Sequence, residues 1–248
     1  MNIDWFNPWV VAIALNTILL GFAFISPKKL LTPWGYLHAW ILGVIIWGTL
    51  AWQGYLVVMF YFLVGSGVTR IGKAEKEAAG IAEGRSGLRG PENVWGSALI
   101  GTLCALGTLL VSEPWQGLFI LGYIASFCTK LSDTCASEIG KAYGKRTFLI
   151  TTLKPVPRGT EGAVSLEGTL AGIVASAAIA FLAWGLNTIS PFGILWCILA
   201  AFIATNLESV IGATIQEKFT FLTNEVVNII NTLIGAIAAI LMAVLFLK

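Results

Sequence analysis

Long apolar stretches alternate with short polar intervals along nearly the whole chain. Most of these stretches approach the ~20 residues that an α-helix needs to cross a bilayer. The pattern therefore predicts an all-α, polytopic membrane protein with about eight transmembrane helices. We expect these helices at residues 10–26, 36–52, 55–68, 94–111, 115–130, 166–186, 191–211 and 226–246.

Cations are distributed unevenly among the polar intervals. If the spans alternate from an external N-terminus, every Lys and Arg except Lys248 lies on one side of the membrane. The positive-inside rule assigns that side to the cytoplasm. The connections at 52–54, 112–114 and 187–190 carry no cation and are expected outside. The sequence thus predicts a basic cytoplasmic face, with both termini on the opposite side.

Composition agrees with a single transmembrane domain that spans residues 1–248. The chain is 57% hydrophobic and 11% charged, which leaves too little polar surface to cover a soluble globule. Its net charge of +2 arises from the loops. Such local clusters suit phosphate or anionic lipid headgroups, so we expect membrane lipids and no nucleic acid as partners. The two long cytoplasmic loops, at about 69–93 and 131–165, hold most of the candidate chemistry.

The first long loop combines a charged helix with a basic, glycine-rich segment. Residues 71–83 predict a helix that sets Arg70, Lys73 and Glu77 along one stripe. Beyond Gly84, cations alternate with glycines, so that the backbone can approach an anion while guanidinium groups clamp it. Binding of lipid headgroups is the alternative role of this loop. The candidate residues are Arg70, Lys73, Lys76, Glu77, Arg85, Arg89 and Asn93.

The second long loop opens with acids, hydroxyls and lysines at the end of a predicted span. An acidic group there costs several kcal/mol unless it is paired, hydrated or bound to a metal. Mg²⁺ prefers one or two carboxylates together with substrate phosphate oxygens, and Asp133 with Glu138 could supply the protein share. A structural salt bridge is the alternative role for Glu138. The polar residues that share the helical face of Asp133 are Lys130, Ser137 and Lys141.

A glycine-rich turn follows in the same loop. Prolines at 155 and 157 make the preceding segment extended, and the turn then leads into a helix that begins near Ser165. Backbone N–H groups at a helix N-terminus bind anions, and an arginine next to the turn adds positive charge. No GxxxxGK[ST] motif occurs, so this is not a Walker A loop. The candidate residues are Arg158, Gly159, Thr160, Glu161 and Gly162.

A third polar cluster lies near the C-terminal end of the chain. Glu208 is expected at the same membrane face as the two loops. Asn224, Asn228 and Asn231 recur at i, i+4 and i+7, which predicts a polar stripe that enters the final span. Hydrogen bonds between helices would explain this stripe without a substrate. Its position at the charged face makes substrate binding the competing interpretation.

Four blocks carry a family resemblance. The segments 65–93, 133–140, 155–165 and 208–213 together resemble the membrane phytyl-phosphate kinase family of the tocopherol pathway. The Asp-Thr block and the later Thr-Glu-Gly turn are also similar, more distantly, to dolichol kinases and phosphatidate cytidylyltransferases. Those relatives carry a Ser-Pro-Lys-Lys-Thr run where this chain has Lys154-Pro155-Val156-Pro157-Arg158-Gly159-Thr160.

The resemblance implies transfer of the γ-phosphoryl group of a nucleoside triphosphate, CTP or another, to a prenyl monophosphate such as phytyl phosphate. A monophosphate is already an anionic nucleophile, so catalysis needs positioning and charge neutralisation rather than a base. The implied roles are Mg²⁺ binding by Asp133 and Glu138, and catalysis by these two with Arg70 and Lys73. The residues 158–162 with Ser137 and Lys141 would hold the nucleotide. The acceptor would contact Lys76, Glu77, Arg85, Arg89, Asn93, Glu208, Asn224 and Asn228.

Three other activities compete with this hypothesis. A CTP-dependent cytidylyltransferase would use the same groups but release pyrophosphate. A prenyl-alcohol kinase would need a base near the acceptor hydroxyl. A non-enzymatic lipid carrier would favour inverted repeats and polar groups at mid-membrane depth. The resemblance also implies a bacterial inner or thylakoid membrane, with the active face cytoplasmic.

Overall fold

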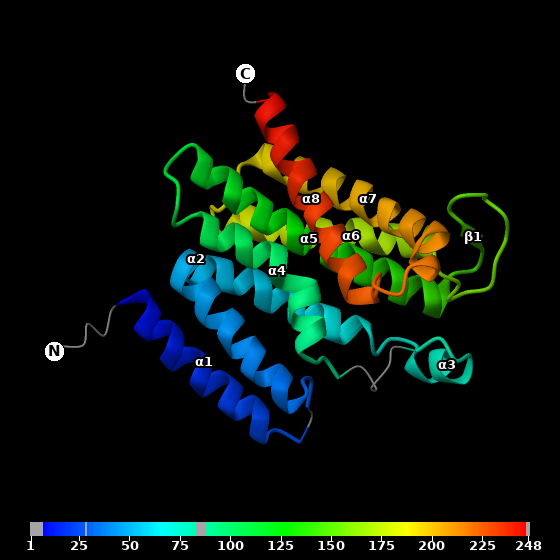
Figure 1. Ribbon diagram of the computed structural model, residues 1–248, viewed down its shortest axis with the longest axis horizontal. Coiled ribbons are helices and arrows are strands. Elements are labelled where there is room, and N and C mark those ends of the chain that lie inside the picture. Colours follow the sequence, from blue (N-terminus) through cyan, green and yellow to red (C-terminus); the bar gives the residue numbers. More distant parts are fainter. Residues whose placement is uncertain (1–6, 28, 83–87, 247–248) are drawn as a thin grey trace.

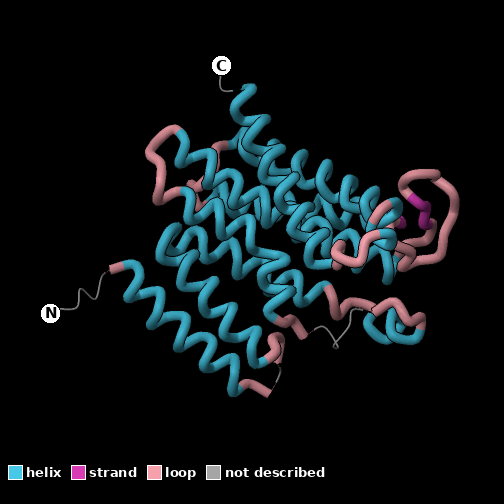
Figure 2. Tube along the Cα trace, viewed as in Figure 1, coloured by secondary structure: helices cyan, strands magenta, loops and turns pink. Residues whose placement is uncertain are grey.

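The computed structural model describes residues 7–27, 29–82 and 88–246 and confirms the predicted all-α, polytopic class. Its helices pack into one bundle, with a small hairpin and a short helix at one end (Figures 1 and 2). The strands β1 (Thr147–Leu149) and β2 (Ala163–Ser165) pair in antiparallel fashion, with Phe148 opposite Val164. The helices are α1 (Pro8–Ile25), α2 (Pro33–Val68), α3 (Lys73–Ala78), α4 (Pro91–Gly107), α5 (Trp115–Tyr143), α6 (Leu166–Gly185), α7 (Pro191–Thr214) and α8 (Asn224–Phe246), with a 3₁₀ turn at Gln216–Lys218.

Helix α2 contains two of the expected spans. Ala51, with φ 51° and ψ −155°, interrupts the helix, and the second half turns back toward α3 (Figure 1). The connection expected at 52–54 is therefore wrong, because these residues are already helical and one residue makes the turn. Buried hydroxyls hold this region: Tyr55 donates to Asn16 of α1 at 2.9 Å, and Tyr123 of α5 donates to the Gly54 carbonyl at 2.7 Å.

Helix α5 occupies the centre of the bundle. Its apolar half buries Tyr123, Phe127 and Leu131 completely. Its polar half approaches α6 closely, because glycines of α6 face small residues of α5. A Cβ atom added at Gly172 would lie 2.8 Å from the Ser132 hydroxyl oxygen. This contact sets the polar half of α5 between α6, α7 and α8, where it forms the floor of the candidate site (Figure 1).

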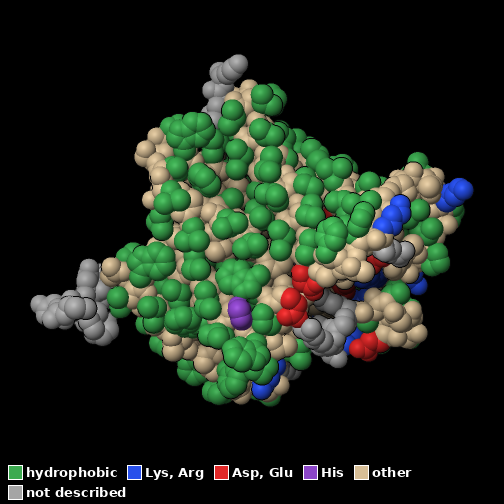
Figure 3. All heavy atoms as spheres, viewed as in Figure 1, with side chains coloured by type: hydrophobic (Ala, Val, Ile, Leu, Met, Phe, Trp, Pro, Cys, Tyr) green, Lys and Arg blue, Asp and Glu red, His purple; other side chains and the backbone are tan. Residues whose placement is uncertain are grey.

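The two ends of the bundle differ in polarity. α3 and β1 lie at one end, and the first residues of α1 and the last residues of α8 lie at the other (Figure 1). Charged side chains gather near the first of these ends, whereas hydrophobic side chains cover most of the visible face (Figure 3). In the part of the chain that the structure describes, five helices, α1, α2, α6, α7 and α8, are long and apolar enough to cross a membrane. The arrangement fits alternating spans, while the cytoplasmic assignment of the charged end stays a prediction.

Both long loops depart in detail from the expected local structure. The helix expected at 71–83 covers only Lys73–Ala78, because Gly80 takes a left-handed conformation with φ 69°. The Gly80 and Ile81 N–H groups then bond back to the carbonyls of Glu77 and Lys76, which closes the helix. In the second loop, β1 and β2 form a hairpin that the sequence did not predict.

Candidate functional site

A cavity of about 420 Å³ opens at the charged end of the bundle. Its walls come from α2, α4, α5, α6, α7 and α8, and from the turn before β2. Segments far apart in the sequence therefore meet around one space. The expected site residues that line it are Arg89, Asn93, Asp133, Ser137, Glu138, Lys141, Gly159, Thr160, Glu161, Gly162, Glu208, Asn224 and Asn228.

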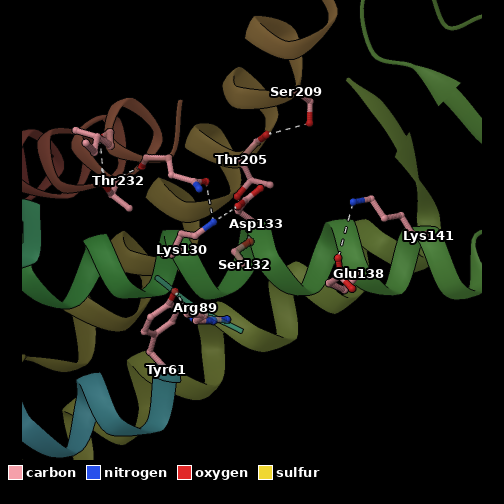
Figure 4. Close-up of polar contacts among 12 residues, drawn as sticks. Tyr61, Arg89, Lys130, Ser132, Asp133, Glu138, Lys141, Thr205, Ser209 and Thr232 are labelled. Atoms are coloured by element: carbon pink, nitrogen blue, oxygen red, sulfur yellow. Dashed lines mark hydrogen bonds and ion pairs between the residues drawn. The ribbon is translucent and has the colours of Figure 1, made fainter. Parts of the chain in front are cut away.

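Lys130 organises the floor of the cavity. Its ammonium nitrogen lies 2.6 Å from an Asp133 carboxylate oxygen and 2.8 Å from the Asn228 side-chain oxygen (Figure 4). Lys130 and Asp133 are one turn apart on α5, and Asn228 comes from α8. The Lys130 and Asp133 side chains keep 9% and 13% of their surface exposed, so the pair borders the cavity. The contact joins two of the three predicted clusters.

Arg89 supplies a second cation from another side. It is 7% exposed, and its guanidinium donates to the Tyr61 hydroxyl at 3.0 Å (Figure 4). Its backbone bonds to Leu30 and Thr32, which ties it to the connection between α1 and α2. Among the residues that the structure describes, no carboxylate lies within ion-pair distance of Arg89. Its positive charge is therefore available to an anion in the cavity.

Glu138 also lines the cavity, but its carboxylate is engaged by lysines. One oxygen forms an ion pair with Lys76, and the other lies 3.8 Å from Lys141 (Figure 4 shows the latter contact). Lys76 is 1% exposed and also donates to the Thr69 carbonyl at 2.9 Å. The pair attaches α3 to α5. This geometry favours the structural salt bridge over metal binding for Glu138.

The glycine-rich turn packs against α7. Gly159 and Gly162 have φ values of 85° and 74°, which favour glycine. A Cβ atom added at Gly162 would lie 2.5 Å from the Ser209 carbonyl oxygen, so a side chain there would collide with α7. The Ser165 hydroxyl oxygen caps α6 by accepting from the Gly168 N–H at 3.1 Å. The sequence predicted that the turn leads directly into the helix. Instead, strand β2 separates the turn from the N-terminus of α6, and the Ser165 hydroxyl already accepts from one backbone N–H group of that terminus.

Several expected residues do not line the cavity. Arg158 is exposed and donates to the Ala142 carbonyl at 2.9 Å. Lys73 pairs with Glu77 on the surface at 3.6 Å, and Arg70 is exposed. Lys76 is buried in its ion pair with Glu138. Arg85 lies outside the described residues.

The lining carries more carboxylates than cations. The described lining cations are Arg89, Lys130 and Lys141, and the carboxylates are Glu92, Asp133, Glu138, Glu161, Glu208 and Glu225. Sequence reasoning did not single out Tyr61, Thr205 or Glu225. Tyr61 resembles any aromatic residue of a span, and only its contact with Arg89 distinguishes it.

Divalent cations can be tested against this donor set. The described residues contain no cluster of three or more His, Cys, Asp or Glu side chains that could hold a metal ion. Mg²⁺ bound with a nucleotide commonly takes only one or two carboxylates, since phosphate oxygens and water complete its shell. Asp133 and Glu208 line the same cavity. Both Glu138 oxygens already lie beside lysines, which leaves this carboxylate less available to a metal ion.

Comparisons with known proteins place the chain among membrane proteins. An uncharacterized membrane protein of Synechocystis, sll0875, is 70% identical over 94% of this chain and 90% of its own length. Protein VTE6, chloroplastic, of Arabidopsis thaliana is 47% identical over 94% of this chain and 72% of its own. The uncharacterized membrane protein MJ0933 of Methanocaldococcus jannaschii is 32% identical over 88% of this chain and 87% of its own length. No solved structure matches.

The family match covers the site as well as the spans. Residues 16–236 match the family described as Integral membrane protein DUF92. This interval includes α2 through most of α8, and with them the two long loops and the cavity. The resemblance expected from the four sequence blocks is confirmed by this match and by the similarity to VTE6. The chain belongs to the DUF92 family of integral membrane proteins.

Proposed function

We propose that this protein is a prenyl-phosphate kinase. It transfers the γ-phosphoryl group of CTP to a prenyl monophosphate such as phytyl phosphate, and it releases the prenyl diphosphate and CDP. The reaction serves tocopherol and prenylquinone synthesis. The similarity to a chloroplastic relative, VTE6, supports this pathway, and the site chemistry supports phosphoryl transfer.

One observation carries the proposal. In a single cavity the structure brings together Arg89, a buried cation with no carboxylate partner among the described residues, and Asp133, a carboxylate bound to Lys130. Phosphoryl transfer between two anions requires cations and metal-binding carboxylates around one space. The described lining contains no histidine or cysteine, so it offers neither a Ser–His–Asp triad nor a cysteine nucleophile.

The chemical step balances without a protein base. A phosphate oxygen of the prenyl monophosphate attacks the γ-phosphorus, the bond to the β-phosphate bridging oxygen breaks, and CDP leaves with that electron pair. The attacking oxygen is ionised near neutral pH, because the second pKa of a phosphate monoester is ~6. The protein must therefore hold two mutually repelling anions in line.

The residues divide this work between them. Arg89 and Lys130 face the phosphates from different sides of the cavity, and Arg89 keeps its orientation through Tyr61. Mg²⁺ would neutralise charge on the transferring group, with Asp133 and Glu208 as its protein ligands. Among the described residues the lining holds more carboxylates than cations, which supports this role, since two anionic substrates would otherwise be repelled. The turn at 159–162 borders the same space and is proposed to contact the nucleotide.

Product analysis tests the proposal. Purified protein is incubated in detergent with phytyl phosphate, Mg²⁺ and each of the four common nucleoside triphosphates, and all products are identified by mass spectrometry. We expect phytyl diphosphate and CDP in equal amounts, with CTP as the best donor. Pyrophosphate together with a cytidylyl lipid would instead identify a cytidylyltransferase. Phytol consumed as fast as phytyl phosphate would identify an alcohol kinase, and no turnover of any donor would support a carrier.

A further inference from the structure

The cavity reaches from the charged end of the bundle to mid-helix depth. Its lining includes Phe202, which lies close to the middle of α7. At 1.5 Å per residue, Phe202 is ~18 Å from the last residue of that helix. Asp133 and the turn at 159–162 line the polar part of the same cavity. The space therefore changes from charged to apolar along the direction of the membrane normal.

Phe202 lies at a second, lateral opening of this cavity. The side chain lines the cavity, yet it keeps 42% of its surface exposed. A residue with both properties forms part of a rim. Ile173 of α6 also lines the cavity and is partly exposed. This lateral opening therefore lies between α6 and α7, at a depth where a spanning helix faces lipid rather than water.

Two other helix pairs around the cavity meet closely at glycines. A Cβ atom added at Gly168 would lie 2.5 Å from the Ala136 carbonyl oxygen, which shows how tightly α6 meets α5. One added at Gly96 would lie 3.1 Å from the Glu225 Cβ atom, so α4 meets α8 in the same manner. Between α6 and α7 the lining includes the longer side chains Thr169, Ile173, Phe202 and Asn206.

The side chains along this opening become less polar from the charged end toward the middle of the helices. Nearest the charged end, Thr205 bonds to Ser132 at 3.3 Å, and Asn206 donates to the Phe202 carbonyl of its own helix at 2.7 Å. One turn deeper come the apolar side chains of Phe202 and Ile173. A free phosphate or a nucleotide would gain nothing from this apolar part. A ligand with a phosphate head and a long apolar tail matches both parts.

We propose that the opening between α6 and α7, lined by Ile173 and Phe202, is the binding site for the prenyl chain of the phosphate acceptor. This proposal rests on the proposed function for the identity of the ligand. The phosphate head lies beside Arg89 and Lys130, and the chain passes out between the two helices into the bilayer. The substrate thus enters laterally from the membrane, while the nucleotide enters from the charged end.

Photo-crosslinking with unmodified phytyl phosphate tests the location directly. Benzoylphenylalanine replaces Phe202 in one variant and Ile203 in a matched control. Ile203 is the next residue, is 44% exposed and does not line the cavity. We expect adducts of phytyl phosphate that saturate with concentration at position 202 and do not saturate at position 203. Equal, unsaturated labelling at both positions would overturn the proposal.

Crosslinking needs no turnover, so it separates this proposal from the proposed function. Saturable labelling at position 202 without CDP formation would retain the chain site and overturn the kinase. Phosphoryl transfer without saturable labelling at position 202 would retain the kinase and overturn the chain site. Saturable labelling by phosphatidylethanolamine at position 202 that equals labelling by phytyl phosphate would also contradict a prenyl-phosphate site.

Chain-length kinetics provide a second test. Ile173→Trp narrows the opening, and we expect it to raise KM for phytyl phosphate about tenfold, the effect of losing contact with about two methylene groups. KM for CTP and for the short acceptor dimethylallyl phosphate should not change, because neither reaches position 173. Ile203→Trp is the control and should alter none of these constants. An equal rise of KM for both acceptors would contradict a chain-binding role.

Discussion

Asp133 and Glu138 lie five residues apart on α5, and each pairs with a lysine, yet their surroundings differ. The Asp133 partner, Lys130, is on the same helix, and the pair borders the cavity beside Asn228. The Glu138 partner, Lys76, comes from α3 and is fully buried. An ion pair that borders an open space can exchange its partner for a substrate. An ion pair whose lysine is buried between two helices stabilises their contact.

The loss of Asp133 should have the largest effect on activity. Asp133→Asn keeps the size of the side chain and an oxygen that can accept from Lys130, so folding should persist. It removes a metal-binding charge, and we expect the rate to fall on the order of 10³-fold. Steady-state kinetics at saturating Mg²⁺, together with a thermal unfolding curve, would measure both effects. A wild-type rate in the folded variant would contradict the proposed role.

The loss of Glu138 should act on stability instead. Glu138→Gln leaves the buried Lys76 ammonium without a counter-charge, which costs about 3–5 kcal/mol when one partner of a buried pair is removed. We expect a lower unfolding temperature and a rate per folded molecule close to that of the wild type. The double variant Lys76→Met/Glu138→Leu should recover much of the stability, because both charges are removed together. A loss of activity as large as that of Asp133→Asn in fully folded protein would mean that Glu138 acts in the reaction.

Two arginines extend the comparison at a smaller scale. Arg89→Lys removes the planar guanidinium that bonds to Tyr61 and faces the cavity, and it should raise KM for the phosphate substrates about tenfold. Arg158→Lys changes an exposed side chain that bonds to the Ala142 carbonyl and should have little effect. Steady-state KM values for both substrates check this. An effect at Arg158 equal to that at Arg89 would place the phosphates beside the turn rather than on the cavity floor.

The last prediction concerns which side of the membrane each end of the bundle faces, and its substitutions perturb the molecule least. Single cysteines replace the exposed residues Ser112 and Thr152, at opposite ends of the bundle, while the native cysteines are buried. In intact cells an impermeant reagent should label position 112, and it should label position 152 only after permeabilisation. The reverse pattern would place Asp133 and Glu138 on the outer face and contradict CTP as donor.

Sequence periodicity predicted the spans because a bilayer requires continuous apolar stretches, and this requirement is local in the chain. It also located Asp133, because an acid at the end of a span is costly without a role. The sequence could not decide whether Glu138 binds a metal or forms a structural salt bridge, because its partner, Lys76, is 62 residues away in the chain. Burial of that lysine depends on how α3 packs, which charge counting does not reveal.

The first loop shows the same limit. Arg70 and Lys73 looked suited to phosphate binding, but the short α3 places Lys73 beside Glu77 on the surface. The β1–β2 hairpin was missed because three-residue strands carry too little periodicity to recognise, and their pairing spans 14 residues between Leu149 and Ala163.

The fate of the γ-phosphorus of CTP tests the central claim most directly. CTP labelled with ³²P at that position is incubated with phytyl phosphate and wild-type, Asp133→Asn or Lys76→Met/Glu138→Leu protein, and the labelled products are separated. The account predicts label in phytyl diphosphate with the wild type and the double variant, and almost none with Asp133→Asn. Label in free pyrophosphate, or equal labelling of the lipid with Asp133→Asn, would contradict it.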